Sequence, residues 1–174
     1  APAPDGVFVA WNRGTPDWGK DNEPYRNGRI FEYNYLHGRR FLELRHIKGD
    51  QVLPVHPDLQ RDVLDLTLPG QHYERPRLLV SSEGALHVLF RYNVGEPRGG
   101  HRNKNRWQTL VMAWDGGRWS EPVELTEAHG LSTGGISAVF DANGNLLVAA
   151  TGEGDAAHPA DLETHVSLYR LEPL

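Results

Sequence analysis

The sequence predicts an all-β protein made of short antiparallel strands. Two observations carry this prediction. Runs of Val, Leu, Phe and Trp alternate with Gly-containing turns, which is typical of strands and hairpins. Pieces of this pattern also return along the chain, which is typical of repeated sheets. A chain of 174 residues and 19.5 kDa is long enough to bury a core of ordinary single-domain size.

The segment 75–125 holds the clearest set of strands. Four are predicted there, paired across the turns 82–85 and 115–117: Pro76–Ser81, Leu86–Tyr92, Trp107–Trp114 and Arg118–Leu125. Asp115-Gly116 is one of the strongest hairpin signals. A long polar loop, 93–106, separates the two hairpins. Four antiparallel strands in about 50 residues match one blade of a β-propeller.

The flanking segments hold further strands. On the N-terminal side the expected strands are Val7–Trp11, Arg29–Leu36 and Arg40–Ile47, the last two around the turn His37–Arg39, with an extra one at Val63–Leu68. We expect the first three to be strands two to four of a blade that lacks its first strand. On the C-terminal side Ile136–Phe140 and Leu146–Thr151 pair across Asp141–Asn145, and Thr164–Leu171 follows.

These strands predict a repeat. Phe8–Arg13, Val88–Asn93 and Val148–Glu153 are expected to occupy the same place in successive units. A period of about 40 to 60 residues favours a propeller, and a β-sandwich is the alternative. The expected organisation is a single all-β domain over 1–174, or a propeller fragment with a partial blade 7–48, a blade 75–125 and a partial blade 135–174.

The connections predict where function lies. In a meander, alternate connections fall on the same edge of the sheet, and here one set is short. The other set consists of long polar loops: 12–28, 48–73, 93–106, 126–135 and 152–163. We call the two sides the short-turn edge and the long-loop edge. Since long loops on a rigid scaffold are usually functional, we expect the site at the long-loop edge.

Composition excludes several classes of function. The formal net charge of −5 and the pI near 6.0 argue against a nucleic-acid partner. No apolar run approaches the roughly 20 residues of a membrane span, and the absence of Cys excludes disulfides and thiolate metal sites. The start Ala1-Pro2-Ala3-Pro4 suits a mature secreted or periplasmic protein, or a fragment boundary.

One turn carries a family resemblance. Ala113-Trp114-Asp115-Gly116-Gly117-Arg118-Trp119-Ser120, followed by Glu121-Pro122, resembles the Asp-box turn of sialidase-like (BNR-repeat) propellers. Asp115 and Trp119 match the family pattern, while Ala113 replaces a hydroxyl residue and the turn is one residue shorter. Arg75-Pro76-Arg77 is similar to the Arg-Ile-Pro start of those propellers. The resemblance covers residues 75–151, and residues 7–47 show a weaker similarity.

This resemblance implies a propeller that faces a polysaccharide or glycan. Propellers of this kind include sialidases, other glycoside hydrolases, polysaccharide lyases and non-catalytic glycan binders. Because the chain supplies only about three blades, we expect the rest of a longer chain, or other copies, to complete the ring.

Cationic and aromatic side chains are the candidate substrate-binding residues. His101, Arg102 and Arg106 lie in one long loop, where Arg can grip the carboxylate of an acidic sugar with two parallel hydrogen bonds. The alternative is a solvated loop without a ligand. Trp18 and Tyr25, in another long loop, could stack on sugar rings or anchor the core.

Three residues that lead into the strand Pro76–Ser81 are the catalytic candidates. His72 and Tyr73 beside Arg75 could perform β-elimination, in which His or Tyr removes the proton next to a uronate carboxylate. The alternative is packing at the start of the strand. Arg91 and Tyr92 end a neighbouring strand at the same edge, and they could bind substrate or pack across strands.

The sequence shows no residue pattern that is typical of glycoside hydrolysis or of metal binding. No two acids stand out as the carboxylate pair of a glycoside hydrolase. The oxygen-rich stretch Asp141–Asn145 lacks the rest of a calcium loop, and its simpler interpretation is a hairpin turn. The histidines show no metal-ligand spacing. We therefore expect no metal and no cofactor.

Overall fold

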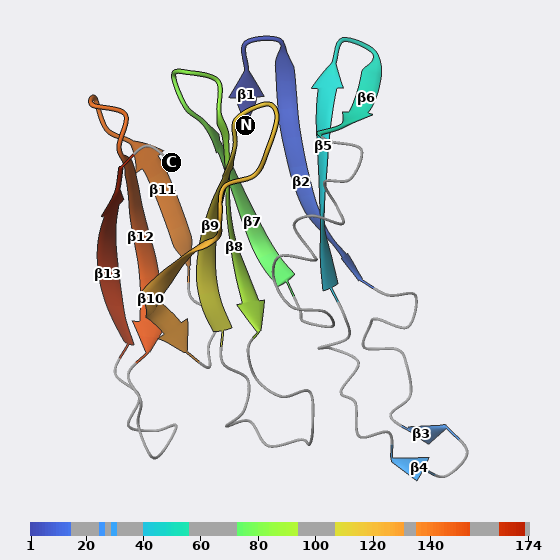
Figure 1. Ribbon diagram of the computed structural model, residues 1–174. Helices are drawn as coiled ribbons and strands as arrows, with labels where there is room; N and C mark the ends of the chain where they lie inside the picture. The colour runs from blue at the N-terminus through green and yellow to red at the C-terminus, as the bar shows by residue number, and fades with distance from the viewer. Residues whose placement is uncertain are drawn as a thin grey trace.

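The computed structural model describes residues 1–14, 25–26, 29–30, 40–55, 73–93, 107–130, 135–153 and 164–172. Within these ranges the chain is all-β: it forms three antiparallel sheets of three or four strands and no helix (Figure 1). A separate two-stranded pair joins β3 (Tyr25–Arg26) to β4 (Arg29–Ile30). The predicted strand Val63–Leu68 lies outside the described residues.

The first sheet has the order β1-β2-β5-β6. Its strands are β1 (Pro2–Ala3), β2 (Gly6–Gly14), β5 (Arg40–Lys48) and β6 (Gln51–Pro54). The sequence interpretation was wrong here in two respects. A short first strand is present, and β5 is the third strand of the sheet because it pairs directly with β2. The tight turn is therefore Gly49–Asp50, where Gly49 has a φ of 55°, and the proposed turn 37–39 lies outside the described residues.

The middle sheet has the order β10-β9-β8-β7 and follows the prediction closely. Its strands are β7 (Tyr73–Val80), β8 (Leu86–Asn93), β9 (Trp107–Trp114) and β10 (Val123–Gly130). The last strand begins later than expected. Trp119 makes only an isolated bridge to Trp114, and Pro122, which has no N–H to donate, immediately precedes the regular ladder.

The last sheet contains β11 (Ile136–Phe140), β12 (Leu146–Glu153) and β13 (Thr164–Leu171) in sequence order. Its first turn repeats that of the middle sheet. In both Ser81–Ala85 and Asp141–Asn145 the first N–H donates to the fifth carbonyl at 2.9 Å. The first side chain in turn accepts the fifth N–H, at 3.1 Å and 2.9 Å respectively. Gly84 and Gly144 supply the positive φ that each turn requires, 90° and 83°.

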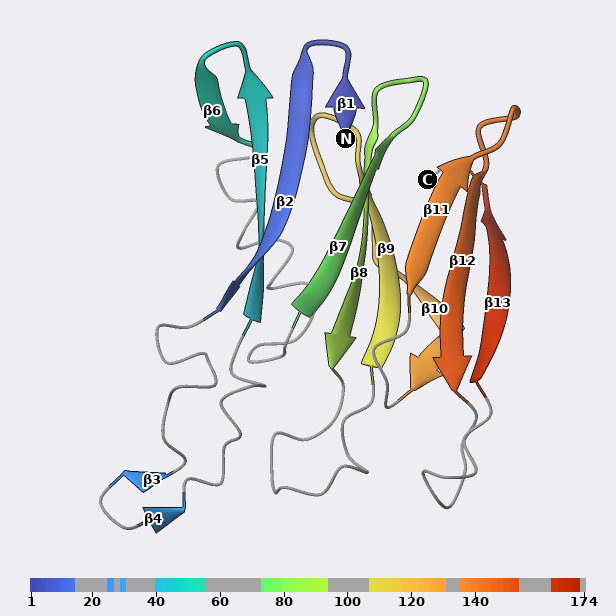
Figure 2. The same ribbon diagram turned by 180° about the vertical axis from the view of Figure 1, so that it is seen from behind.

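The three sheets stack face to face, with the middle sheet between the others (Figures 1 and 2). Two apolar clusters form the contacts. Between the first and middle sheets lie Phe8, Leu42, Leu44, Tyr73, Leu86, Val88, Phe90, Leu110, Met112 and Trp114. Between the middle and last sheets lie Leu89, Val111, Leu125, Ile136, Leu146, Val148 and Ala150. Because both faces of the middle sheet are covered, β8 and β9 are buried nearly throughout, and the polar His87, Arg91 and Thr109 are buried with the apolar residues.

The repeat differs by one residue from the one that the sequence predicts. Phe8 faces the sheet that follows it in the chain, whereas Val88 and Val148 each face the sheet that precedes them. Since neighbouring strand residues face opposite sides, a one-residue shift reverses the facing. Phe8 therefore has the facing of His87 and Leu89, and the His87 ring packs against Phe140 of the last sheet.

The two predicted edges are present in the described strands. The turns 4–5, 49–50, 81–85, 115–122 and 141–145 share one edge, at the top of Figure 1. At the opposite edge β2, β8, β10 and β12 end, and β5, β7, β9, β11 and β13 begin. No described sheet closes on itself. The architecture established here is therefore a stack of three antiparallel sheets.

Candidate functional site

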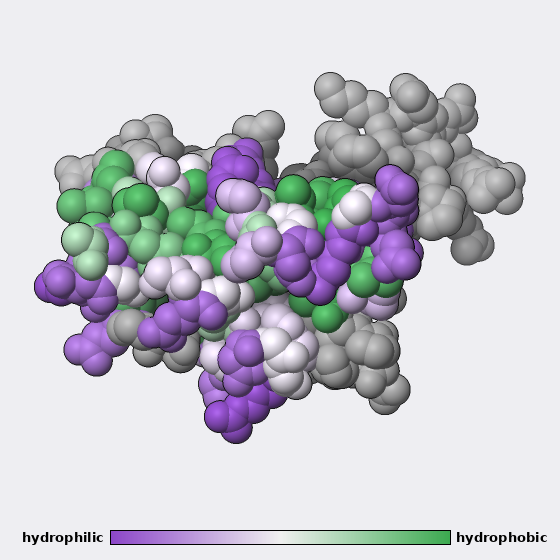
Figure 3. All heavy atoms as spheres, turned by 90° about the horizontal axis from the view of Figure 1, so that it is seen from above, coloured by the Kyte–Doolittle hydropathy of each residue, from purple (hydrophilic) through white to green (hydrophobic). Residues whose placement is uncertain are grey.

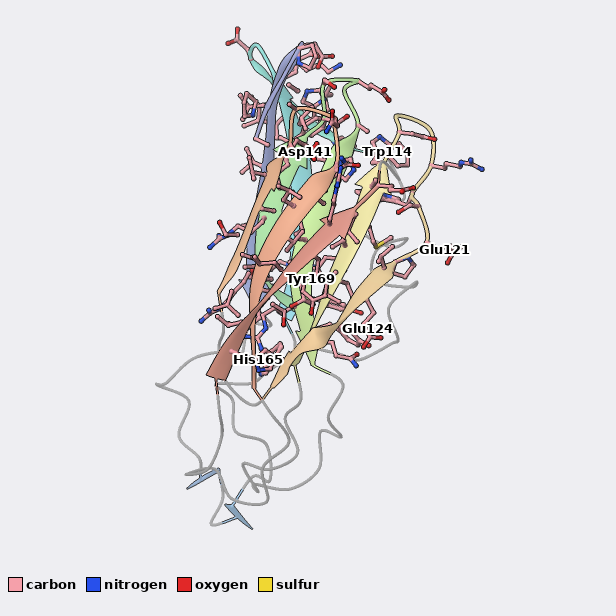
Figure 4. All side chains as sticks on the ribbon, turned by 90° about the vertical axis from the view of Figure 1, so that its left-hand side faces the viewer. Trp114, Glu121, Glu124, Asp141, His165 and Tyr169 are labelled. Carbon is pink, nitrogen blue, oxygen red and sulfur yellow. The ribbon has the colours of Figure 1, made fainter. Side chains whose placement is uncertain are left out.

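The long-loop edge is the candidate site, and the structure describes part of it. Four of the predicted residues lie there: Tyr73 and Arg75 on β7, and Arg91 and Tyr92 on β8. Figure 4 shows the two edges, with His165 and Glu124 toward the long-loop edge and Trp114 and Asp141 toward the other. The remaining predicted residues, His72, Trp18, His101, Arg102 and Arg106, lie outside the described residues. Tyr25 lies in β3, but its side chain is not described.

Arg75 occupies an unusual backbone conformation. Its φ of 56° is the only positive value among the described non-glycine residues. The ladder between β7 and β8 is irregular at this point, because Glu74 pairs with Arg91 and the next pair is Arg77 with Leu89. This bulge lifts Arg75 out of the regular ladder, and Pro76 further restricts the residue before it. Strain of this kind, of order 1–3 kcal/mol, tends to gather at functional sites.

Glu74 and Arg75 form an ion pair across this bulge. Arg75 Nε lies 3.7 Å from Glu74 Oε1, and the side chain of Arg75 is 42% exposed while that of Glu74 is 8% exposed. The arginine therefore reaches solvent while its carboxylate partner stays inside. An exposed arginine side chain can form charge-assisted hydrogen bonds to an anionic ligand.

Tyr73 and Tyr92 form a cross-strand pair that faces the first sheet. Tyr73 is 2% exposed and packs edge-on against Phe90, with ring centroids 5.9 Å apart. The contact of its ring with Phe90 is a packing contact. The Tyr92 hydroxyl donates to Gln108 Oε1. Burial first, and then the nearby Glu124 and Tyr73, raise the pKa of Tyr92. Tyr92 therefore stays protonated at neutral pH and is suited to donate a hydrogen bond.

Arg91 faces the last sheet. It is 2% exposed, and its guanidinium carbon lies 5.5 Å from the centre of the Trp107 ring, which is a cation–π contact. Its pairing opposite Glu74 on β7 adds a carboxylate-bearing residue to the same side of the sheet. In the described structure, Arg91 is thus a buried packing residue at the long-loop edge.

Asn12 was not anticipated as part of the site. Its side-chain amide donates a 2.7 Å hydrogen bond to the backbone carbonyl of Tyr73, which ties β2 to the start of β7. Glu74 was likewise not singled out from the sequence. Its inward position follows from strand alternation once Tyr73 is known to face the first sheet, but the bulge that follows it has no clear signal in the sequence.

The turn that resembles an Asp box has the geometry that its residues suggest. Asp115 Oδ1 accepts the backbone N–H groups of Gly117 and Arg118, each at 2.8 Å. Ser120 closes the turn by hydrogen bonds to both backbone groups of Ala113. These N–H donors hold the pKa of Asp115 below its usual range. The turn lies at the short-turn edge, away from the candidate site.

The described ranges hold neither a metal cluster nor a membrane-spanning helix. No group of three or more His, Asp or Glu side chains lies close enough to hold a metal ion there. No helix among those residues is long and apolar enough to cross a membrane. Comparisons with protein-family models, with curated proteins and with solved structures found no match to this chain.

Proposed function

We propose that this chain is part of a sialidase-like β-propeller that recognises an acidic glycan at its long-loop edge. The observation that carries the proposal is the presentation of Arg75. The half-exposed side chain of Arg75 stands on a strained bulge at the edge where the long loops begin and end. The stack of antiparallel meanders and the side-chain-capped turn at Asp115 support the propeller part of the proposal.

The proposed ligand is a sugar carboxylate, as in a uronate or a sialate. Arg75 would pair with it, and Arg102 and Arg106 would add charge from the neighbouring loop. Stacking of the sugar ring on Trp18 or Tyr25 would supply apolar contact. In the elimination version, which requires a uronate, His72 takes the proton from the carbon next to the carboxylate. The electron pair of that C–H bond forms a C=C bond, the C–O bond to the leaving sugar breaks, and the leaving oxygen takes a proton from solvent. Hydrolysis of the glycosidic bond is the other catalytic version.

A non-catalytic module that binds glycan or protein is the second candidate. It is favoured by the described tyrosines. Tyr73 is buried, and the raised pKa of Tyr92 disfavours a phenolate that could act as a base. Any base must then come from His72 or from another loop residue. Turnover, as opposed to binding, separates the two candidates.

The test is calorimetric titration of the full chain with uronate and sialoside oligosaccharides, together with a neutral oligosaccharide of equal length. We expect binding of the acidic ligands only, and weaker binding at higher salt. Ultraviolet absorbance of unsaturated uronate detects elimination, and new reducing ends detect hydrolysis. Equal affinity for the neutral ligand would show that the site does not read the carboxylate.

Variants locate the site. Arg75→Ala, Arg102→Ala and Arg106→Ala should each weaken acidic-glycan binding, by about tenfold for the loss of one charge-assisted contact. Arg118→Ala, at the short-turn edge and 88% exposed in its side chain, is the matched control. His72→Ala should abolish elimination without changing affinity. A retained rate would remove His72 from the role of base.

A further inference from the structure

The outer face of the last sheet is open and mostly apolar, with the exposed Arg170 opposite Leu147 on the same face. Its exposed large residues are Val139 at 58%, Leu147 at 37%, Val166 at 63% and Leu168 at 82%. They share one face because Leu147 pairs with Val139, and Ala149, two residues further along β12, pairs with Leu168. Figure 3 shows hydrophobic residues gathered at this end of the molecule, on the left. Contiguous exposed apolar surface of this kind marks an interaction site.

The internal contacts show what such a face packs against. Each contact joins the forward face of one sheet, which looks toward the next sheet in the chain, to the backward face of that next sheet. The middle sheet uses Leu89 and its partner Val111 on its forward face, and both are fully buried. The corresponding pair in the last sheet is Ala149 and Leu168. Leu168 therefore occupies a position that is covered by another sheet one unit earlier.

The first sheet offers the other half of the same contact. Its open face is a backward face, and it carries a row of three apolar residues, Val7, Ile47 and Val52, one on each of three strands. Val7 is 45% and Val52 63% exposed, and Trp11 on the same face is 38% exposed. The described sheets thus leave one forward face and one backward face open.

We propose that two copies of this chain pack head to tail, with the forward face of each last sheet against the backward face of the other copy's first sheet. A second copy is the occupant that fits both faces, because the two open faces are of the kinds that already pair inside the chain. Both contacts form at once only where the three sheets turn through half a circle, as half of a propeller would, and a two-fold axis then closes the assembly. The inference rests on the propeller of the proposed function, and it does not depend on what the long-loop edge binds.

The experiment measures the mass of the 174-residue chain in solution by light scattering and sedimentation equilibrium. We expect twice 19.5 kDa. Leu168→Glu and Val52→Glu each place a charge in the contact, and each should raise the dimer dissociation constant by on the order of a hundredfold. Both positions are more than 60% exposed, so the sheets themselves are undisturbed. Ala142→Glu, in an exposed turn, adds the same charge outside both faces and should remain dimeric.

A mixture of the two variants tests the head-to-tail arrangement. Leu168→Glu leaves the backward face intact and Val52→Glu leaves the forward face intact, so the mixed dimer keeps one undamaged contact. Mixing should therefore restore part of the dimer that each variant alone lacks.

Three outcomes overturn the proposal. A monomeric wild-type chain is one, because it leaves both faces to further sheets of a longer protein. Val52→Glu that dimerises like the wild type is another, because the last sheets would then pair with each other. Growth into open polymers rules out the closed pair.

Discussion

Asn12 Nδ2 donates a 2.7 Å hydrogen bond to the backbone carbonyl of Tyr73, and this bond joins the first and middle sheets at the long-loop edge. Tyr73 begins β7, and Glu74 and the strained Arg75 follow directly. The amide therefore fixes the backbone from which the candidate cation is presented. An inter-sheet bond at this point contributes both to stability and to the position of Arg75.

The first prediction concerns this amide. Asn12→Ala should lower the free energy of unfolding by about 1–2 kcal/mol, because the carbonyl of Tyr73 loses its partner in a partly buried place. Urea denaturation gives the value. Asn143→Ala, which removes an exposed amide at the short-turn edge, is the control and should change stability by less than about 0.5 kcal/mol. Equal effects would show that the inter-sheet bond is not formed in solution.

The second prediction separates the backbone strain at Arg75 from its charge. Arg75→Gly and Arg75→Ala both remove the guanidinium, but only Gly adopts a φ of 56° without steric cost. Arg75→Gly should therefore be more stable than Arg75→Ala by about 1 kcal/mol. Both should lose acidic-glycan affinity to the same extent. Identical unfolding midpoints would mean that residue 75 relaxes out of the left-handed region.

The third prediction concerns Leu89, which lies on β8 at the contact between the middle and last sheets. It is fully buried, so Leu89→Ala should cost about 2–5 kcal/mol of unfolding free energy, the sum of lost apolar transfer and the cavity left behind. Leu53→Ala is the control at a position that is 37% exposed, and it should cost about 1 kcal/mol or less. A small loss at Leu89 would indicate that the two sheets do not pack together in solution.

The fourth prediction is a pH dependence at the turn that resembles an Asp box. Backbone N–H donors from Arg118 and Gly117 hold the pKa of Asp115 below its ordinary value of 3.8. The stability that this carboxylate contributes is therefore present above that value and is lost as the pH falls through the lower, folded-state pKa. Asp115→Ala should be less stable than the wild type at neutral pH, and the difference should shrink in acid. Thermal unfolding over a pH series measures it, and a constant difference would contradict the bond pattern.

Strand positions could be read from the sequence because their causes are local. Three predicted strands match the observed ones to the residue: Trp107–Trp114, Ile136–Phe140 and Thr164–Leu171. Each is rich in aliphatic, aromatic or β-branched residues and is bounded by polar or Gly-containing segments. The error in the first sheet also has a physical cause. Val7–Trp11 pairs with a strand that begins 29 residues after Trp11, and periodicity within a strand carries no information about its partner.

The sequence could predict at which edge the candidate site lies, but not the backbone conformation or the burial of its residues. The alternation of short and long connections placed Arg75, Arg91 and Tyr92 on one side of the sheets. The bulge at Arg75 and the burial of Arg91 depend on how β7, β8 and the last sheet meet. The one-residue shift of the Phe8 repeat arises in the same way, because the turn before β2 is shorter than the five-residue turns of the other sheets.

The last prediction concerns His87 at the contact between the middle and last sheets. Its ring is 3% exposed and packs against Phe140, and burial lowers its pKa below the ordinary value of 6.5, with the Ala85 carbonyl opposing weakly. The unfolded chain therefore takes up the proton first, so stability falls as the pH drops below about 6.5 and levels off beneath the folded-state pKa. His87→Leu should remove this loss, while His165→Gln, at an exposed position, should retain it. Unfolding free energies from about pH 8 to about pH 5 give the comparison. An unchanged slope in His87→Leu would assign the acid sensitivity to another group.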